Sequence, residues 1–261
     1  MPASKSSANT DQEFLPSLEK GLAVLELFGA EAPELTLTQI ARALGLTPGS
    51  AHRVLLTLER LGYLVCEDNR FSLKTRVMQL GFAYLSSQPL AKVARPVLTE
   101  LAVKLQANCS VAVLDDTDVL YVARATYRYI NRDFVSIGSR FPAHATSPGK
   151  VLLATLSEEE LRKRFKDKSL EAFTPNTVSS LKALRAELAE ARAQGYAIND
   201  QQTFLGHRSV AIPLKIDDQI VAALVCGSEV SQVRTNTLVN EYLPAMRASS
   251  DLLAKLTAVL V

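Results

Sequence analysis

Two short helices in immediate succession are the feature that most narrows the fold of this chain. The first has a clear start at Thr36-Leu-Thr-Gln39, which has the form of a capping box, and it stops at Gly45. A second start follows almost at once, because Thr47 can act as an N-cap and Pro48 suits the first helical turn. This second helix carries an apolar stripe at helical spacing and ends at Gly62. The sequence therefore predicts two helices joined by a short turn that contains glycine.

The segments on either side of these helices predict a third helix and a β-hairpin. Apolar residues at helical spacing indicate a helix from Ser17 to about Phe28, and residues 63–66 and 70–73 flank an acidic turn. A helix, a helix-turn-helix and a hairpin, in this order, are typical of a winged helix-turn-helix domain, which we place at residues 17–74. The pattern alone also fits a small helical cap on an enzyme.

The rest of the chain predicts a short linker helix and a domain of mixed helices and strands. We expect a disordered tail at residues 1–16, a linker helix at 75–88 and a second domain at 89–261. Helices and hairpin-paired strands are mixed in that domain, which indicates an α+β fold with an antiparallel sheet. The expected strands lie at residues 111–114, 119–123, 134–137, 209–214 and 220–225. In the C-terminal helix, which starts at about residue 236, we expect Pro244 to cause a kink.

Composition and charge exclude some classes of protein and weakly favour others. With 261 residues, 48% of them hydrophobic, the chain is long enough for two cores, and disorder is excluded. No apolar run approaches the roughly 18 residues of a membrane span, and the first residues lack a signal peptide, so we expect a cytoplasmic protein. The net charge is only +2, but residues 37–86 carry six basic side chains against three acidic ones. This local excess is a modest indication of a polyanionic partner.

No constellation of catalytic residues stands out. The sequence lacks the GxSxG, HExxH and GxGxxG motifs, and Pro148-Gly149-Lys150-Val151 lacks both ends of a phosphate-binding loop. The three cysteines are far apart and have neither CxxC nor Cys/His metal spacing, so we expect buried thiols. The sequence thus predicts no catalytic residue, no metal and no cofactor.

Two polar segments predict a small-molecule pocket in the second domain. Ser147 can cap a helix with Pro148 at its first position, and Gly149 would leave the first-turn N–H groups open to a carboxylate. The same residues also describe an ordinary helix start. A second polar group lies just before and at the start of an apolar strand, where such groups orient a ligand, namely Asn199, Asp200, Gln201, His207, Arg208 and Ser209.

From residue 17 to about residue 256 the chain resembles the IclR-type bacterial transcription regulators. The resemblance rests on long motifs in the right order, namely SLEKGLAVLELF, LTLTQIARALGLTPGSAHRVLLTLERLGYL, RFSLKTRVMQLG, PAHATSPGKVLLATL, FTPNT, LRAELAEARAQGYAIND and HRSVAIPL. It implies an N-terminal winged helix-turn-helix, a linker helix and a C-terminal GAF-like domain that binds a small effector. It also implies assembly as homodimers or dimers of dimers. Within the family, the motifs are most similar to the regulators of aromatic-acid and β-ketoadipate catabolism.

The resemblance also implies which residues surround the effector. In family members the pocket is built around positions that correspond here to Ser147, Pro148, Asn199, His207, Ser209, Val225 and Gly227. Many members have an acidic residue at Asn199, and some have serine on the last strand, where this chain has Val225 and Gly227. The less acidic and more apolar pocket favours an aromatic or longer apolar carboxylate, and we expect the effector to be an aromatic or dicarboxylic acid.

The winged-helix reading assigns a DNA-binding face. At about 100° per residue, Ser50, Arg53 and Thr57 share a face that is turned away from the apolar stripe of the second helix of the motif. The residues expected to contact double-stranded DNA are Thr38, Gln39, Thr47, Ser50, His52, Arg53 and Arg70. The expected function is a transcriptional regulator controlled by a small organic acid. The alternative is an enzyme of small-molecule metabolism that uses the C-terminal domain.

Overall fold

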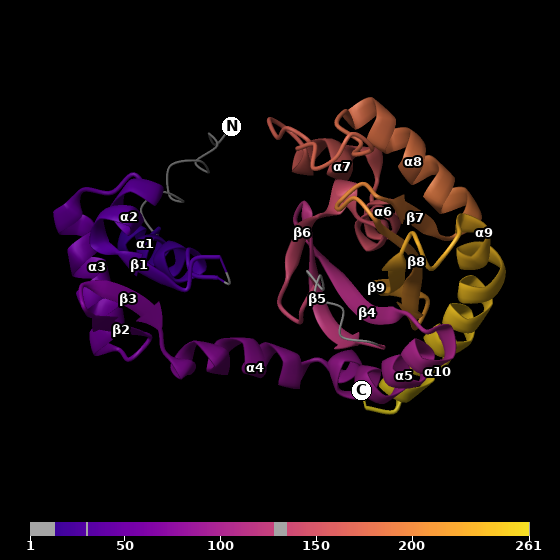
Figure 1. Cartoon of the computed structure of the whole chain (residues 1–261), viewed down its shortest axis with the longest axis horizontal. Helices are drawn as coiled ribbons and strands as arrows, with labels where there is room; N and C mark the ends of the chain where they lie inside the picture. The colour runs from indigo at the N-terminus through magenta and orange to yellow at the C-terminus, as the bar shows by residue number, and fades with distance from the viewer. Residues whose placement is uncertain (1–13, 30, 128–134, 261) are drawn as a thin grey trace, which may run out of the picture. The chain divides into compact units, whose positions relative to one another are not determined.

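The computed structural model describes residues 14–29, 31–127 and 135–260 and divides the chain into two compact units. The first unit ends at Ala83 and the second begins at Tyr84, so the division lies within helix α4 (Met78–Ser87) (Figure 1). A 3₁₀ turn, η1 (Thr75–Val77), precedes α4, and together they occupy the stretch for which the sequence predicts a linker helix.

The N-terminal unit is a winged helix-turn-helix, as the sequence predicts. Its helices are α1 (Pro16–Glu26), α2 (Leu37–Ala43) and α3 (Pro48–Arg60). Its strands are β1 (Glu34–Thr36), β2 (Leu64–Glu67) and β3 (Arg70–Leu73), and they form an antiparallel sheet in the order β1-β3-β2. The sequence did not predict β1, because three residues are too short for an alternating pattern. Of the tail expected at residues 1–16, residues 1–13 lie outside the described residues, and α1 already includes Pro16.

Local capping explains why α2 and α3 begin where they do. The hydroxyl of Thr36 accepts a hydrogen bond from the backbone N–H of Gln39 at 3.3 Å, and the Gln39 side chain accepts one from the Thr36 N–H at 2.8 Å. At α3 the hydroxyl of Thr47 accepts a hydrogen bond from the Ser50 N–H at 3.3 Å. Gly45 ends α2 with a φ of +63°, a left-handed conformation that glycine adopts without strain. Both predicted caps are confirmed. The core beneath them consists of Val24, Ile40, Leu55, Leu58, Leu64 and Phe71.

The C-terminal unit is built on a six-stranded antiparallel sheet in the order β6-β5-β4-β9-β8-β7. The strands are β4 (Asn108–Asp115), β5 (Asp118–Ala125), β6 (Arg140–Pro142), β7 (Ala197–Asp200), β8 (His207–Ile216) and β9 (Gln219–Glu229). The helices and helical turns are α5 (Pro89–Leu105), η2 (Ala143–Ala145), α6 (Ser147–Leu153), α7 (Glu158–Arg164), α8 (Leu181–Gln194), α9 (Thr235–Thr237), η3 (Leu238–Tyr242) and α10 (Leu243–Ala258). The fold is therefore α+β, as the sequence predicts.

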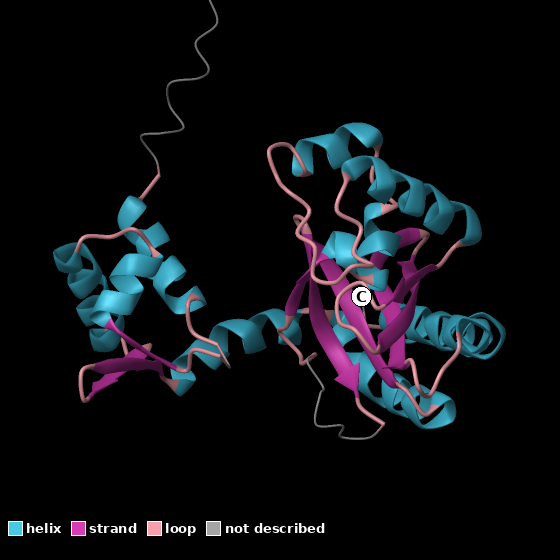
Figure 2. Cartoon of the chain, turned by 45° about the horizontal axis from the view of Figure 1, so that its top comes forward, coloured by secondary structure: helices cyan, strands magenta, loops and turns pink. Residues whose placement is uncertain are grey.

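Helices cover both faces of this sheet, and each face has its own core (Figure 2). Helices α5 and α10 pack on one face, and α6, α7 and α8 lie on the other. The register between β4 and β5 shifts between Val111 and Ala112, because Val122 of β5 has no partner on β4, and the consecutive Val122 and Ala123 both lie in the core on the side of α5 and α10. The face that carries α6 is the one that positions the candidate site described below.

Several sequence-based expectations for this unit are wrong. Residues 135–137 do not form the predicted strand, Phe134 lies outside the described residues, and the observed strand at this place is β6. Strand β7 was not predicted, because the polar Asn199 and Asp200 interrupt the apolar alternation. Near Pro244 the departure from regular helix is the five-residue π-helical turn η3, which directly precedes α10. Cys109 and Cys226 are buried as expected, whereas Cys66 is only half-buried.

Candidate functional site

Helix α3 presents an exposed polar face opposite its apolar stripe. Ala51, Leu55 and Leu58 are buried, whereas His52 and Arg53 are exposed. Thr47, Thr38, Gln39 and Arg70 are also exposed, and Ser50 is half-buried. The expected DNA-contacting residues therefore lie on the surface, at the starts of α2 and α3, along α3 and at the start of β3.

A pocket in the C-terminal unit is the second candidate site. It encloses about 790 Å³ of empty space, open solvent at its mouth included, between the sheet and the loop that joins β7 to β8. Five of the predicted effector residues line it, namely Asn199, His207, Ser209, Val225 and Gly227. These residues lie on β7, β8 and β9.

Aromatic side chains form one wall of the pocket. Tyr121 meets Phe141 edge to face with ring centroids 6.0 Å apart, and Phe141 meets Phe204 in the same way at 5.6 Å. Burial raises the pKa of Tyr121 to about 12, and the positive charge of Arg124 opposes this rise. Tyr121 is therefore a neutral phenol at physiological pH and can donate a hydrogen bond into the pocket.

Arg124 brings a positive charge to the same pocket. It lies on β5 opposite Ser110 on β4, and its Nη1 donates a hydrogen bond to the Ser110 hydroxyl at 3.1 Å. Among the described lining residues, Arg124 and His207 are the ones that can carry a positive charge. Sequence reasoning missed Arg124 and the aromatic wall. A charged residue near the end of an otherwise apolar strand was the available signal.

The polar end of the pocket is tied together by hydrogen bonds within the protein. Asn199 donates to the carbonyl of Ala145 at 3.0 Å and to the Thr203 hydroxyl at 2.8 Å, and its Oδ1 accepts from the Gln202 N–H at 2.8 Å. The Thr203 hydroxyl also lies 2.6 Å from the Ala145 carbonyl. Asn199 thus organises the β7–β8 loop as well as lining the pocket.

Gly227 on β9 leaves room for two side chains of the neighbouring strand β8. A Cβ atom at Gly227 would stand 2.8 Å from Nε2 of His207 and 3.2 Å from Cβ of Ser209. The first contact would require the His207 ring to move and the second would require a shift of a few tenths of an ångström, so the absence of a side chain at Gly227 leaves room for His207 and Ser209 at the pocket.

The predicted helix start at Ser147 is wrong in its details. The N-cap of α6 is Thr146, whose hydroxyl accepts a hydrogen bond from the Gly149 N–H at 3.1 Å, so that donor is not open to a ligand. Ser147 is the first residue of the helix, and its hydroxyl lies 2.8 Å from that of Ser209. Neither Ser147, Pro148 nor Gly149 lines the pocket. The error arose because Pro148 suits either of the first two helical positions, which leaves two candidate caps.

Asp200 and Arg208 also have a different place from the one expected. They are register partners on β7 and β8, and the Arg208 guanidinium donates to both carboxylate oxygens of Asp200, at 3.0 and 2.8 Å. Its third contact is the carbonyl of Val233 at 3.0 Å. Neither residue lines the pocket, so this pair ties β7, β8 and the segment after β9 together.

The described residues include no helix that could span a membrane and no cluster that could hold a metal ion. No helix there combines the length and apolar character needed to cross a membrane. No three His, Cys, Asp or Glu side chains there are grouped so that they could hold a metal ion.

An exposed winged-helix face in one unit and a lined pocket in the other define a DNA-binding protein with a ligand-binding unit. The comparisons with known proteins then identify the family. Residues 17–67 match the IclR helix-turn-helix domain, and residues 82–254 match the C-terminal domain of the bacterial transcriptional regulator IclR. The chain belongs to the IclR family of bacterial transcriptional regulators.

Individual relatives cover almost the whole chain. It is 36% identical to a Pca regulon regulatory protein of Pseudomonas putida over 95% of this chain and 87% of that protein. It is 34% identical to a p-hydroxybenzoate hydroxylase transcriptional activator of Acinetobacter baylyi, over 94% and 93%. It also resembles the crystal structure of an IclR homologue from Microbacterium hydrocarbonoxydans in complex with 4-hydroxybenzoate, with a TM-score of 0.77 and 25% identity over 93% and 99%.

Proposed function

We propose that this transcriptional regulator responds to an aromatic carboxylic acid that binds in the pocket of the C-terminal unit. The observation that carries the proposal is the position of one guanidinium, that of Arg124, in a pocket with an aromatic wall. An arginine forms strong charge-assisted hydrogen bonds with a carboxylate, and aromatic side chains favour a planar ring. The names of two relatives, which concern p-hydroxybenzoate and the Pca regulon, support the same class of effector.

The pocket also favours an acid with a polar substituent far from its carboxylate. Arg124 lies on β5, whereas His207 begins β8 on the other side of β4 and β9, and Thr203 lies in the loop before it. An acid with its carboxylate at Arg124 would therefore direct its opposite end toward Thr203 and His207. A hydroxyl group there would find hydrogen-bonding partners, which unsubstituted benzoate would leave unused.

Calorimetry on the full chain tests this proposal. We expect 4-hydroxybenzoate to bind more tightly than benzoate, and both to bind more tightly than the aliphatic adipate. A gel shift on the promoter region of the gene, with and without the best acid, then tests whether the acid changes DNA binding. Tighter binding of adipate than of either benzoate would contradict the assignment of an aromatic effector.

The expected organisation of the chain is part of the proposal. Residues 17–74 bind DNA, residues 75–88 link the two domains, and residues 89–261 bind the effector. Because the regulator acts on bacterial DNA, we propose that it works in the cytoplasm.

Arg53→Ala is expected to weaken operator binding by roughly 1 to 3 kcal/mol, or about fivefold to 150-fold, if Arg53 makes a bidentate base contact. The side chain is exposed on α3, so its removal should hardly change the melting temperature. The measurement is a gel-shift titration at fixed salt. Arg162→Ala on α7, an equally exposed site in the other unit, removes the same charge and serves as the control. Equal losses for the two variants would mean that only net charge matters.

The exposed apolar side chains of the N-terminal unit favour assembly of the regulator as a dimer. Met78 and Phe82 on α4 are 74% and 72% exposed, and Leu18 and Leu22 on α1 are 59% and 50% exposed. The two residues of each pair are four positions apart and so lie on one face of their helix, and adjoining exposed apolar side chains are typical of an interface between proteins. We expect at least dimers, bound to a palindromic operator with half-sites about one helical turn apart.

Phe82→Glu is expected to weaken or abolish the dimer, since it would place a charge within the apolar interface. Sedimentation velocity at micromolar concentration would then show a shift toward the monomer. Gln79→Glu adds the same charge at an exposed polar position of the same helix and should leave the dimer intact. A wild-type chain that sediments as a monomer would exclude this interface.

A further inference from the structure

An ion pair between α6 and α8 joins a buried ammonium to a half-buried carboxylate. Lys150 is only 1% exposed, and its Nζ forms an ion pair with the Glu187 carboxylate. Burial lowers the pKa of Lys150, while the negative charge of Glu187 raises it. A buried ammonium is costly unless it is fully paired, so the neighbours of Lys150 are of interest.

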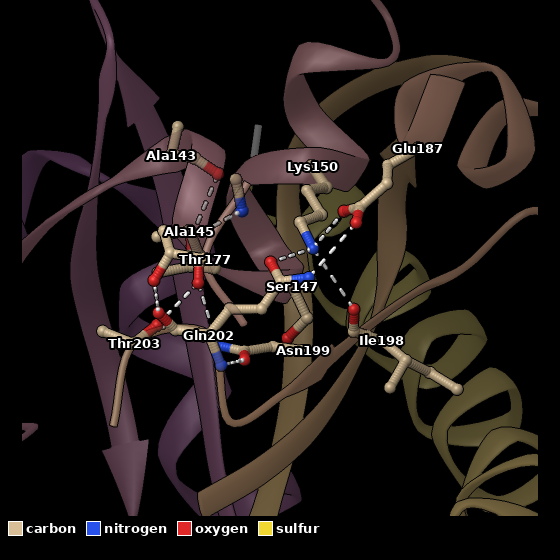
Figure 3. Close-up of polar contacts among 12 residues, drawn as sticks. Ala143, Ala145, Ser147, Lys150, Thr177, Glu187, Ile198, Asn199, Gln202 and Thr203 are labelled. Carbon is tan, nitrogen blue, oxygen red and sulfur yellow. Dashed lines mark hydrogen bonds and ion pairs between the residues drawn. The ribbon is translucent and has the colours of Figure 1, made fainter. Parts of the chain in front are cut away.

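The side chain of Gln202 completes this pair into a group of three. Its Oε1 accepts a hydrogen bond from Lys150 Nζ at 2.5 Å, and its Nε2 donates to Glu187 at 3.2 Å (Figure 3). Lys150 Nζ also lies 3.5 Å from the carbonyl of Ile198 on β7. One amide therefore contacts both members of the ion pair, with its donor facing the carboxylate and its acceptor facing the ammonium.

Gln202 belongs to the β7–β8 loop that walls the pocket. Its own N–H donates to Asn199, and its carbonyl accepts from the Thr177 hydroxyl at 2.5 Å (Figure 3). The next two residues, Thr203 and Phe204, line the pocket. Lys150, Glu187 and Gln202 themselves do not line it. The three side chains thus fix a loop whose neighbouring residues face the bound molecule.

We propose that Lys150, Glu187 and Gln202 are positioning residues that hold the loop of residues 201–206 in its binding conformation and thereby set the affinity for the effector. The part of this inference that concerns affinity rests on the function proposed above. A loop already fixed in its bound conformation loses less entropy when the ligand binds. A buried pair is also a poor source of net stability, because apolar residues of similar size often stabilise a protein as well. An ion pair of this kind can hold the loop in one conformation, which apolar side chains in its place would not do.

Gln202→Met tests the link directly, because methionine has a similar length and lacks both amide groups. Hydrogen–deuterium exchange on the full chain should become about tenfold faster in residues 201–206, with the central strands β4 and β9 unchanged. The Kd for 4-hydroxybenzoate should rise about fivefold to tenfold, because part of the binding free energy is then spent on ordering the loop. Gln219→Met, at an exposed position at the start of β9, is the matched control and should change neither quantity.

Exchanging the charges at positions 202 and 187 distinguishes a positioning role from a simple loss of packing. Gln202→Glu places a second carboxylate beside Glu187 and should weaken binding of 4-hydroxybenzoate more than Gln202→Met does. Combining it with Glu187→Gln restores one carboxylate and one amide around Lys150. The double variant should therefore recover a Kd within about threefold of wild type, although each side chain has been changed.

Each outcome decides the proposal. Unchanged exchange in the loop of Gln202→Met, or a double variant no better than Gln202→Glu, would overturn it. Faster exchange with an unchanged Kd would overturn the part that concerns affinity. If the wild-type chain does not bind 4-hydroxybenzoate at all, the proposed effector fails, and the exchange data on the same variants still decide whether the three residues hold the loop.

Discussion

Gly149→Ala is expected to lower the free energy of unfolding of the C-terminal unit by about 3 kcal/mol, at the upper end of the usual cost of overpacking. A Cβ atom at this position would stand 2.1 Å from the carbonyl oxygen and 2.3 Å from the Cα of Ala143. These are backbone atoms of η2, so no flexible side chain can move aside. All seven residues of α6 are buried, which prevents the helix from shifting outward without disturbing the core.

Urea unfolding followed by near-ultraviolet circular dichroism would measure this loss. Six of the seven tyrosines lie at or after Tyr84, so the signal reports mainly on the C-terminal unit. In a thermal scan the same change corresponds to a melting temperature lower by about 6 to 12 °C for a unit of this size. Gly81→Ala on α4, where an added Cβ meets no atom within 4 Å, should be neutral or slightly stabilising. A Gly149→Ala variant as stable as wild type would show that α6 and Ala143 are not packed as closely as described.

Arg124→Met is expected to weaken effector binding by about a hundredfold, the second large effect. The carboxylate would lose charge-assisted hydrogen bonds worth roughly 1.5 to 3 kcal/mol each, and 1.4 kcal/mol is a factor of ten in Kd. Methionine preserves much of the length and apolar volume of the side chain, so the pocket should keep its shape. Calorimetric titration of the full chain with 4-hydroxybenzoate provides the measurement. Operator binding without the acid should be unchanged.

Arg208→Met should be measured beside Arg124→Met. Arg208 is bonded to Asp200 and to the Val233 carbonyl and does not line the pocket. The loss of Arg208 should lower the stability of the C-terminal unit, because the Asp200 carboxylate and the Val233 carbonyl would be left without their donor. It should change the Kd for 4-hydroxybenzoate by less than about threefold. A larger loss of affinity for Arg208→Met than for Arg124→Met would restore the sequence-based assignment and refute the one drawn from the structure.

Local signals in the sequence were sufficient for most helices of both units. The capping boxes at Thr36 and Ser157, the cap at Thr47 and the left-handed Gly195 after α8 all involve residues within one helical turn of each other. Such interactions are set by the chain itself and do not depend on a distant partner. The short range of these signals also explains why two strands were not predicted. Strands β1 and β7 have only three and four residues and exist because a neighbouring strand pairs with them.

The family resemblance, rather than a local signal, predicted part of the pocket. His207, Ser209, Val225 and Gly227 occur at the places that the family resemblance implies, and all four line the pocket. The helix start at Ser147 was misread because Thr146 is equally able to cap a helix, and in the structure the Thr146 hydroxyl is the group that accepts the Gly149 N–H.

The sequence alone determined the two-part organisation, the winged helix-turn-helix and the identity of most helices, because caps and periodicity act over a few residues. The tertiary structure alone decided which arginine serves the pocket. Strand register places Arg208 opposite Asp200, neither of which lines the pocket, and places Arg124 opposite Ser110, both of which line it. A shift of one residue in the register would turn each side chain to the other face of the sheet. Contacts between strands far apart in the chain fix that register, and no local pattern in the sequence records it.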